Sequence, residues 1–305
     1  MDHDVDIAIV GGGPAGLAAG IRARMRGLET ALFEARPAPV DKACGEGLMP
    51  AALEALERLG VTDLDGHTFQ GVRYRDADDD TVAAVGEFTR GAGLGVRRTR
   101  LHEALWRRAE AAGVELHRVR AEEVQVGEKK VEVEGIEARY LVVADGLHSR
   151  LRSQLGLQGR SFGPERYGVR RHYETTPWTS YVEVYWSERG EAYVTPVGPE
   201  AVGVAILSEG GGRFDELIGA FPRLQDRIGL AAVTSRDQGA GPFLQRASSV
   251  VSGRVLLVGD AAGYVDALTG EGVALAVETG AAAAEAIAER SPEDYRVAWR
   301  RLTRS

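Results

Sequence analysis

Residues 6–17 read DIAIVGGGPAGL, in which a short apolar strand runs into glycines with the spacing G-x-G-x-x-G. Gly11 suits a tight turn, Gly13 lets the backbone approach a pyrophosphate, and Gly16 lets helix and strand pack closely. The free N–H groups at the start of the helix predicted from Leu17 to Gly27 then face the phosphates. The stretch therefore predicts a dinucleotide site with contacts from Gly11, Gly13, Pro14, Ala15 and Gly16.

A second apolar strand, residues 30–33, ends directly before Glu34, which follows the glycines by about 20 residues. A carboxylate at that place can accept hydrogen bonds from ribose hydroxyls, and it would repel a 2′-phosphate. A lone glycine fingerprint could be an ordinary glycine-rich turn, but the strand, the helix and the acidic residue together favour a dinucleotide. The contacts expected on the adenosine side are Glu34, Ala35 and Arg36.

The composition is that of an ordinary soluble protein, with 305 residues, 44% hydrophobic residues and a formal net charge of −8. The negative charge disfavours a sequence-independent nucleic-acid binder. The single cysteine, Cys44, excludes an internal disulfide and suits a reducing cytoplasm. No stretch approaches about 18 consecutive apolar residues, so we expect no membrane span. The acidic N-terminus runs straight into a strand, so we also expect no signal peptide, and the spacing of Cys and His predicts no metal site.

Strands of the nucleotide domain come from both ends of the chain. Further buried strands are predicted at residues 140–144 and 255–258, and β-rich segments with alternating polarity lie between residues 166 and 207. That alternation predicts an antiparallel sheet with one face covered. The expected division is a discontinuous nucleotide domain of residues 1–71, 97–158 and 250–305, and a β-rich substrate domain of residues 72–96 and 159–249.

Two further motifs follow buried strands. Residues 145–152, DGLHSRLR, fit D-G-x-x-S-x-x-R, and residues 259–263, GDAAG, fit a G-D motif. Together with the glycine fingerprint they resemble the three signatures of FAD-dependent group A monooxygenases and the related geranylgeranyl reductases, over residues 5–290. The resemblance implies an α/β fold in which a Rossmann-like FAD-binding domain is interleaved with a β-rich substrate domain, as in aromatic hydroxylases. It also implies FAD as the cofactor and NAD(P)H as the electron donor.

The resemblance assigns flavin contacts around the later motifs. Asp260, beside Gly259, would bind the ribityl hydroxyls, and a simple helix cap is the alternative. The segment TGEG at residues 269–272 opens a helix predicted to end at Arg290, and its free N–H groups suit the anion of a reduced flavin ring. The contacts implied there are Gly270, Gly272 and Val273. Asp145, Gly146 and Arg152 would support the flavin and nicotinamide region, although Asp145 could be only a turn former.

Two segments offer further contacts. Arg98 precedes Leu101 with the family's R-x-x-[hydrophobic] spacing, but His102 stands where the family has an acid, and a surface arginine is the alternative. Residues 44–48, CGEGL, resemble a geranylgeranyl reductase segment that passes close to the isoalloxazine, which implies contacts from Cys44, Gly45, Gly47 and Leu48. Cys44 is the one catalytic candidate, since it could tune the flavin or contact substrate; a small buried apolar thiol is the alternative.

Two enzyme interpretations follow from the resemblance. The favoured one is an NAD(P)H-using monooxygenase in which O₂ forms a flavin hydroperoxide that hydroxylates or epoxidises a hydrophobic aromatic or polyketide-like small molecule. The alternative is a geranylgeranyl reductase-like enzyme that reduces isoprenoid C=C bonds, and the CGEGL and TGEG segments favour it. A non-catalytic protein similar to the Rab GDP-dissociation inhibitors would have no use for Asp260. The W-x-W-x-I-P signature of flavin halogenases is absent.

Overall fold

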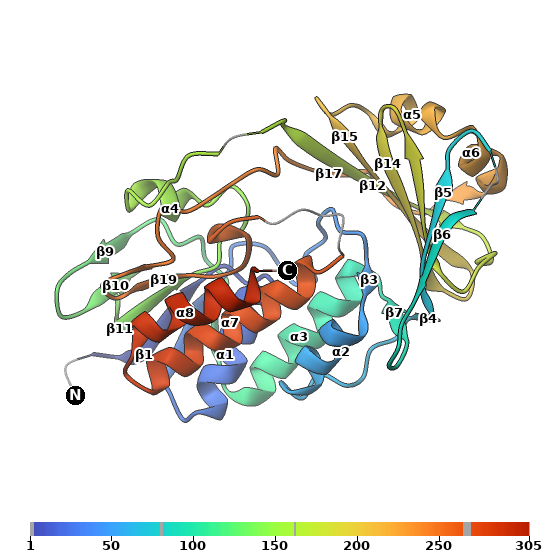
Figure 1. The fold of residues 1–305 in the computed structure, drawn as a ribbon. Helices are drawn as coiled ribbons and strands as arrows, with labels where there is room; N and C mark the ends of the chain where they lie inside the picture. Colours follow the sequence, from blue (N-terminus) through green and yellow to red (C-terminus); the bar gives the residue numbers. More distant parts are fainter. Residues whose placement is uncertain (1–2, 80–81, 162, 265–269, 305) are drawn as a thin grey trace.

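The computed structural model describes residues 3–79, 82–161, 163–264 and 270–304, and it places them in two domains joined by several chain crossings (Figure 1). One domain contains a mostly parallel sheet covered by helices, and the other contains a second large sheet. The fold is therefore α/β, with a Rossmann-like domain interleaved with a β-rich domain, as the sequence predicts.

The sheet of the first domain is built on β1 (Val5–Val10), whose apolar residues are buried on both faces. β1 pairs in parallel with β2 (Thr30–Phe33) and β11 (Ile136–Val143), and the full order is β18-β19-β11-β1-β2-β8. Parallel strands buried on both faces require near-continuous apolar sequence, which these segments have. The remaining strands are β8 (Glu115–His117), β9 (Val124–Val126), β10 (Val131–Val133), β18 (Val251–Ser252) and β19 (Val255–Leu257).

Several helices pack along one side of this sheet (Figure 1). The tightest pair is α1 (Pro14–Met25) and α7 (Gly272–Ala288), because a Cβ on Gly280 would lie only 2.1 Å from the Ala15 carbonyl oxygen. α7 matches the long helix predicted from residue 272, although it ends two residues before Arg290. The other helices of this domain are α2 (Pro50–Glu57), α3 (Arg98–Ala112), α4 (Arg150–Gln154) and α8 (Pro292–Leu302).

The second sheet has the order β16-β12-β15-β14-β13-β5-β6, and β17 also pairs with β12. The pairs among the strands of residues 166–207 are antiparallel, as the sequence predicts. β5, from an earlier part of the chain, joins this sheet in parallel with β13. The strands are β5 (Gly71–Asp76), β6 (Val82–Glu87), β12 (Arg166–Glu174), β13 (Val182–Ser187), β14 (Gly190–Gly198), β15 (Ala201–Glu209), β16 (Ala232–Val233) and β17 (Gln238–Ala240).

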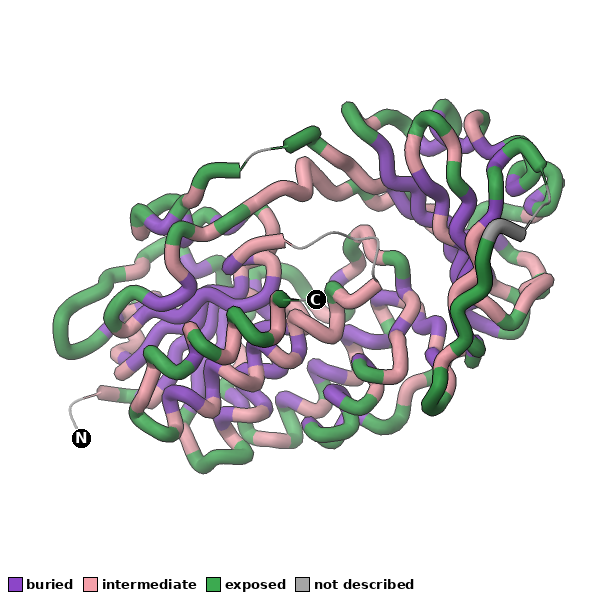
Figure 2. The backbone as a smooth tube through the Cα atoms, viewed as in Figure 1, coloured by how far each residue is buried: buried purple, intermediate pink, exposed green. Residues whose placement is uncertain are grey.

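One face of the second sheet is covered, as the sequence predicts. α5 (Phe214–Leu217) and α6 (Pro222–Ile228) lie on it, and their apolar side chains join those of β12, β14 and β15 in a separate core. Figure 2 shows that the buried backbone is concentrated in the strands of both domains. A small third sheet of β3 (Gly47–Leu48), β7 (Gly93–Gly95) and β4 (His67–Phe69) lies between them. Among the described residues, no helix is both long and apolar enough to cross a membrane.

Candidate active site

The carboxyl ends of the central parallel strands meet at one edge of the first sheet, where open α/β sheets bind ligands. Gly11 directly follows β1, and Glu34 directly follows β2. Asp145 and Gly259 follow β11 and β19, in each case after one intervening residue. These positions are far apart in the sequence, and the parallel pairing of their strands brings them to one edge. The structure thus gathers the three predicted motifs into one site.

The glycine turn is dictated by close backbone contacts. Gly11 has φ +110°, and a Cβ there would lie 2.2 Å from the Ala144 carbonyl oxygen. A Cβ on Gly16 would lie 1.9 Å from the carbonyl oxygen of Gly11. A Cβ on Gly13, in contrast, would meet no described atom within 4 Å, so the space in front of Gly13 is open. Gly11 and Gly16 therefore shape the turn, and Gly13 leaves room at the N-terminus of α1 for a phosphate.

Glu34 is buried, and its carboxylate also holds the glycine turn in place. Its carboxylate accepts hydrogen bonds from the Gly12 N–H at 3.0 Å and from the Arg36 N–H and Nε at 3.0 and 3.2 Å. Burial on its own would raise the pKa of Glu34, but the bonds from Arg36 and Gly12 outweigh it and lower the pKa. The ionised carboxylate thus braces the glycine turn, and a carboxylate has about four acceptor positions, so it retains capacity for a ribose hydroxyl.

Arg98 is not a surface residue, because only 5% of it is exposed. Its backbone N–H donates to Glu46 Oε1 at 2.7 Å, whereas its buried Nη1 has no hydrogen-bond partner among the described residues. A buried guanidinium N–H without a partner is costly. Arg98 therefore presents a free, positively charged donor at the strand-end site, as expected of a residue that contacts an anionic cofactor.

His102, which replaces the family's acid, braces the same glycine turn from the other side. It is fully buried, and its Nε2 lies 2.9 Å from the Gly12 carbonyl oxygen, so Nε2 carries the hydrogen and donates it. Burial and the nearby Arg98 lower the pKa of His102 to about 4. The side chain is therefore neutral at pH 7, and the exchange of an acid for histidine supplies a donor to the turn.

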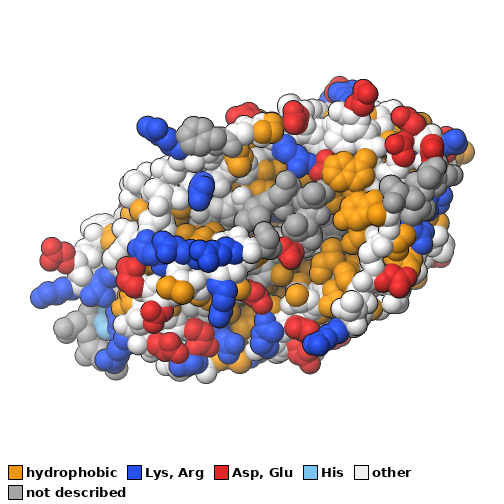
Figure 3. All heavy atoms as spheres, in the orientation of Figure 1, with side chains coloured by type: hydrophobic (Ala, Val, Ile, Leu, Met, Phe, Trp, Pro, Cys, Tyr) orange, Lys and Arg blue, Asp and Glu red, His pale blue; other side chains and the backbone are white. Residues whose placement is uncertain are grey.

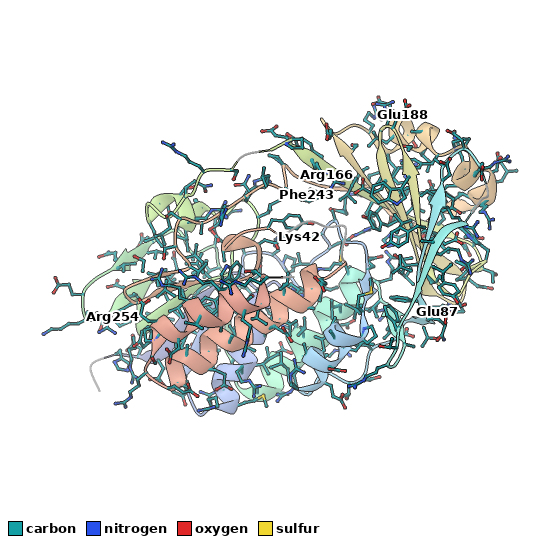
Figure 4. All side chains as sticks on the ribbon, viewed as in Figure 1. Lys42, Glu87, Arg166, Glu188, Phe243 and Arg254 are labelled. Atoms are coloured by element: carbon teal, nitrogen blue, oxygen red, sulfur yellow. The ribbon has the colours of Figure 1, made fainter. Side chains whose placement is uncertain are left out.

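Asp260 lies among cations. Burial raises its pKa, and the neighbouring Lys42 and Arg98 oppose that shift. Lys42, which lies between the two domains in Figure 4, has its pKa lowered by burial of its ammonium group and then by Arg36. Gly259, with φ +54°, brings this segment against Ala15 at the start of α1. Asp260 is thus held beside the glycine turn, and Lys42 joins a positive cluster that the sequence did not place there.

The D-G-x-x-S-x-x-R motif divides into two roles. Asp145 accepts from the Leu151 N–H at 3.1 Å through Oδ2, and its buried Oδ1 has no partner among the described residues. Gly146, with φ +88°, lies beside Lys42 Nζ. All five N–H donors of Arg152 are used within the protein, on oxygens of Gln158, Asp260, Ala261, Leu147 and Gln245. Arg152 therefore braces the Asp260 segment and offers no free donor to a ligand, an arrangement that suits a supporting role.

The CGEGL segment forms a strained loop. Glu46 has φ +61°, and its N–H donates to Cys44 Sγ at 3.3 Å. Burial and then Glu46 raise the pKa of Cys44, so the side chain stays a neutral thiol rather than a nucleophilic thiolate. Gly45 is exposed, and its carbonyl accepts from Thr195 Oγ1 at 2.7 Å. Gly47 packs near Val182 and Leu48 is buried in the core, so Gly45 is the more open of these positions.

The second domain clamps this loop through a buried pair that the sequence did not reveal. Glu46 Oε2 accepts a hydrogen bond from His172 Nε2 at 2.5 Å, and both side chains are nearly inaccessible to solvent. His172 Nδ1 lies 3.0 Å from Arg170 Nη1, which can only donate, so Nδ1 carries no hydrogen and the ring is neutral. Burial also lowers the pKa of His172. Arg170 further donates to the Lys42 carbonyl at 3.0 Å and pairs with Asp41.

The start of α7 completes the site. Gly270 has φ +66°, and a Cβ there would lie 2.7 Å from Met49 Cε. α7 begins at Gly272, where a Cβ would meet no described atom within 4 Å, and the helix has no side-chain cap at its N-terminus among the described residues. Val273 in its first turn is half-buried. Thr269, part of the TGEG segment, lies outside the described residues. The free N–H groups of this turn therefore remain available to an anion.

Comparison with known proteins identifies the family. The model described as an FAD binding domain matches residues 4–211, more than half of the chain. The chain belongs to this flavoprotein family. It is an FAD-dependent oxidoreductase.

Two curated relatives match this flavoprotein over most of its length. Menaquinone reductase of Mycolicibacterium smegmatis is 30% identical, over 98% of this chain and 80% of the relative. The chloroplastic geranylgeranyl diphosphate reductase of Oryza sativa is 29% identical, over 95% of this chain and 68% of the relative. Among solved structures, the flavin-dependent halogenase CmlS superposes with a TM-score of 0.87 at 18% identity, covering 99% of this chain and 62% of CmlS. At that identity the likeness to CmlS concerns the fold alone.

The residues present fit FAD. The orphaned Nη1 of Arg98 and Oδ1 of Asp145 are a donor and an acceptor without protein partners among the described residues, and both are buried. The open space at Gly13 and at Gly272 lies at the N-termini of α1 and α7. Positive charge from Arg98 and Lys42 suits a pyrophosphate and an anionic flavin ring. The site thus keeps an unpaired donor on Arg98 and an unpaired acceptor on Asp145, and a bound dinucleotide could pair with both.

We expect the Glu46–His172 pair to control the exposure of Cys44. In His172→Phe, Glu46 would lose its buried donor, so the loop should loosen and alkylation of Cys44 by iodoacetamide should accelerate about fivefold or more. Because Cys44 is the only cysteine, the total rate of labelling reports this loop alone. His172→Gln should restore part of the protection, and His148→Ala, a change at an exposed histidine, serves as the control. An unchanged rate in His172→Phe would contradict the clamp.

The low pKa of His102 predicts acid sensitivity. The unfolded chain takes up a proton on His102 below about pH 6.5, whereas the folded protein resists it until about pH 4, so stability is lost as the pH falls through that window. Between pH 7 and pH 4.5 the unfolding free energy should fall by about 2 kcal/mol more than in His102→Gln, which keeps a donor for Gly12. Urea unfolding at the two pH values measures the difference. Equal losses in both proteins would remove His102 from this role.

Proposed function

We propose that this flavoprotein reduces a C=C bond in the isoprenoid chain of a hydrophobic substrate, of the class represented by prenylated quinones. Support comes from the whole-length likeness to menaquinone reductase and to geranylgeranyl diphosphate reductase, both named for reduction. The observation that carries the proposal is the CGEGL loop held against the flavin site, since this segment resembles the reductase branch. The monooxygenase interpretation, favoured from motifs alone, now ranks second.

Each part of the site has a distinct task in holding FAD. The Gly11–Gly16 turn and the N-terminus of α1 would bind the pyrophosphate, and Glu34 would accept from the adenosine ribose. Asp260 would accept from the ribityl hydroxyls, and the start of α7 would face the flavin ring. When bound, FAD supplies the two-electron chemistry that reduction of a C=C bond requires.

The protein's own contribution is charge, shape and exclusion of water. Lys42 and Arg98, which lie near Asp260, would supply positive charge beside the bound cofactor, and the neutral Cys44 keeps its proton at Sγ. Hydrophobic side chains gather between the two domains, beside the hollow visible in Figure 3. That surface suits an apolar isoprenoid chain. The proposal includes NAD(P)H as the electron donor and a cytoplasmic location, which the single free cysteine supports.

Anaerobic turnover tests the proposal. The FAD-loaded protein, NADH or NADPH and a menaquinone with a short prenyl chain should yield a product that is heavier by two hydrogen atoms, because no oxygen is required. Mass spectrometry of the extracted quinone, after its ring is reoxidised in air, measures the hydrogen added to the chain, with reactions lacking the nucleotide as the control. A product that forms only in air and carries one added oxygen atom would reject the reductase and restore the monooxygenase.

Arg98 should be important for binding FAD. Arg98→Gln removes a buried charged donor, so the Kd for FAD should rise by about tenfold to a hundredfold, as expected for a hydrogen bond to a charged group. Quenching of flavin fluorescence on titration into apoprotein measures the change. Arg100→Gln on the same helix is the matched control, because Arg100 is exposed and pairs only with Glu103 at 3.6 Å. Equal affinities in both variants would remove Arg98 from the cofactor site.

A further inference from the structure

A basic groove of about 750 Å³ lies beside α8, away from the glycine turn. It runs between α8, residues 244–250 and residues 160–161, which follow α4 along the chain. Figure 3 shows Lys and Arg side chains gathered in a row over α8. The arginines that line it are Arg160, Arg246, Arg296, Arg300 and Arg304, and none of its described lining residues is acidic. This is unexpected in a chain whose net charge is −8.

Most of these arginines have nothing to neutralise them. Arg296 is tied down, because it donates to Ser249 Oγ at 2.7 Å and to the Val251 carbonyl at 3.0 Å, and it pairs with Glu293. The guanidinium groups of the other four make no hydrogen bond or ion pair with any residue that the structure describes. Like charges brought together on one surface repel each other, which costs stability.

The helix dipole explains only part of this cluster. Arg300 and Arg304 lie at the end of α8, where a positive side chain interacts favourably with the C-terminal carbonyls. Arg160 and Arg246, however, come from two other segments that are not near a helix C-terminus of their own. Unpaired guanidinium groups thus converge from three segments, and local helix stability does not explain why they do.

The remaining lining residues suit an organic phosphate. Trp299 is half-buried, and Tyr264 stacks on Phe243 with ring centroids 4.9 Å apart, so both present firm aromatic surfaces. Ser248 and Thr303 add hydroxyl groups. Planar guanidinium groups bind phosphate oxygens in pairs, and aromatic faces accept a planar ring. The volume lies within the range of about 300–1,000 Å³ that is usual for small-molecule sites.

We propose that this groove binds an organic phosphate of nucleotide size, held by Arg160, Arg246, Arg300 and Arg304, at a second site beside the FAD cradle. The groove includes Ala262 and Gly263 of the GDAAG segment, but it shares no lining residue with the Gly11–Gly16 turn, with Glu34 or with Asp260. Its chemistry is that of a phosphate ester, which a soluble nucleotide or a phospholipid headgroup can supply. The proposal holds whether or not the protein reduces isoprenoids, because it depends on the groove alone.

Calorimetric titration of the FAD-loaded protein with inorganic pyrophosphate and with ADP tests the site, since FAD already occupies its own pyrophosphate position. The double variant Arg246→Gln, Arg300→Gln should bind these probes at least tenfold more weakly. Arg189→Gln, at an exposed arginine in the turn between β13 and β14, is the matched control and should bind as the parent does. Unchanged visible absorbance shows that each variant keeps its flavin.

Vesicle sedimentation separates the two sources of phosphate. Tight binding of ADP without binding to vesicles identifies a soluble nucleotide. Binding to phosphatidylglycerol vesicles but not to phosphatidylcholine vesicles, lost in the double variant, identifies a headgroup. The proposal is overturned if pyrophosphate, ADP and anionic vesicles all fail to bind saturably, or if the double variant and the Arg189→Gln control behave alike.

Discussion

The flavin site depends on how Gly12 is held at both of its backbone polar groups. Its N–H donates to the buried Glu34 carboxylate, and its carbonyl accepts from the neutral His102. Neither contact is part of the glycine fingerprint, yet both fix the turn whose open side faces a phosphate. The lowered pKa of Glu34 keeps its carboxylate ionised, so it can accept from the Gly12 N–H. The lowered pKa of His102 keeps its ring neutral, and Nε2 donates to the Gly12 carbonyl. The glycines permit the turn, and these two side chains hold it.

The second domain completes the site through polar contacts rather than through apolar packing alone. His172 and Arg170 on β12 hold Glu46 and the Lys42 carbonyl, and Thr195 on β14 holds the Gly45 carbonyl. A buried ionic network of this kind adds little net stability, because desolvation offsets the attraction. It does fix geometry, since any displacement leaves buried groups unsatisfied. The loop that carries Cys44 therefore has one favoured position relative to the strand ends.

The sequence was sufficient for the fold and for the edge of the sheet where the site lies, because strand, turn and acidic residue recur at fixed spacings that backbone geometry imposes. It could not reveal His172, since a histidine in an alternating strand carries no local signal of its partner 126 residues away. Arg98 and Arg152 looked alike as motif arginines. Only tertiary packing distinguishes them, because it leaves Arg98 with an unpaired donor and pairs every donor of Arg152.

Fold and function diverge in this family, and the divergence has a physical cause. This chain shares its fold with the flavin-dependent halogenase CmlS at a TM-score of 0.87 and is 30% identical to a menaquinone reductase, so the fold alone does not decide the reaction. What must differ is which molecule reaches the flavin ring. In this chain the loop of residues 41–48 lies beside the strand-end site, and side chains of the second domain set its position. Changes in β12 and β14 would therefore move this loop while leaving the glycine turn unchanged.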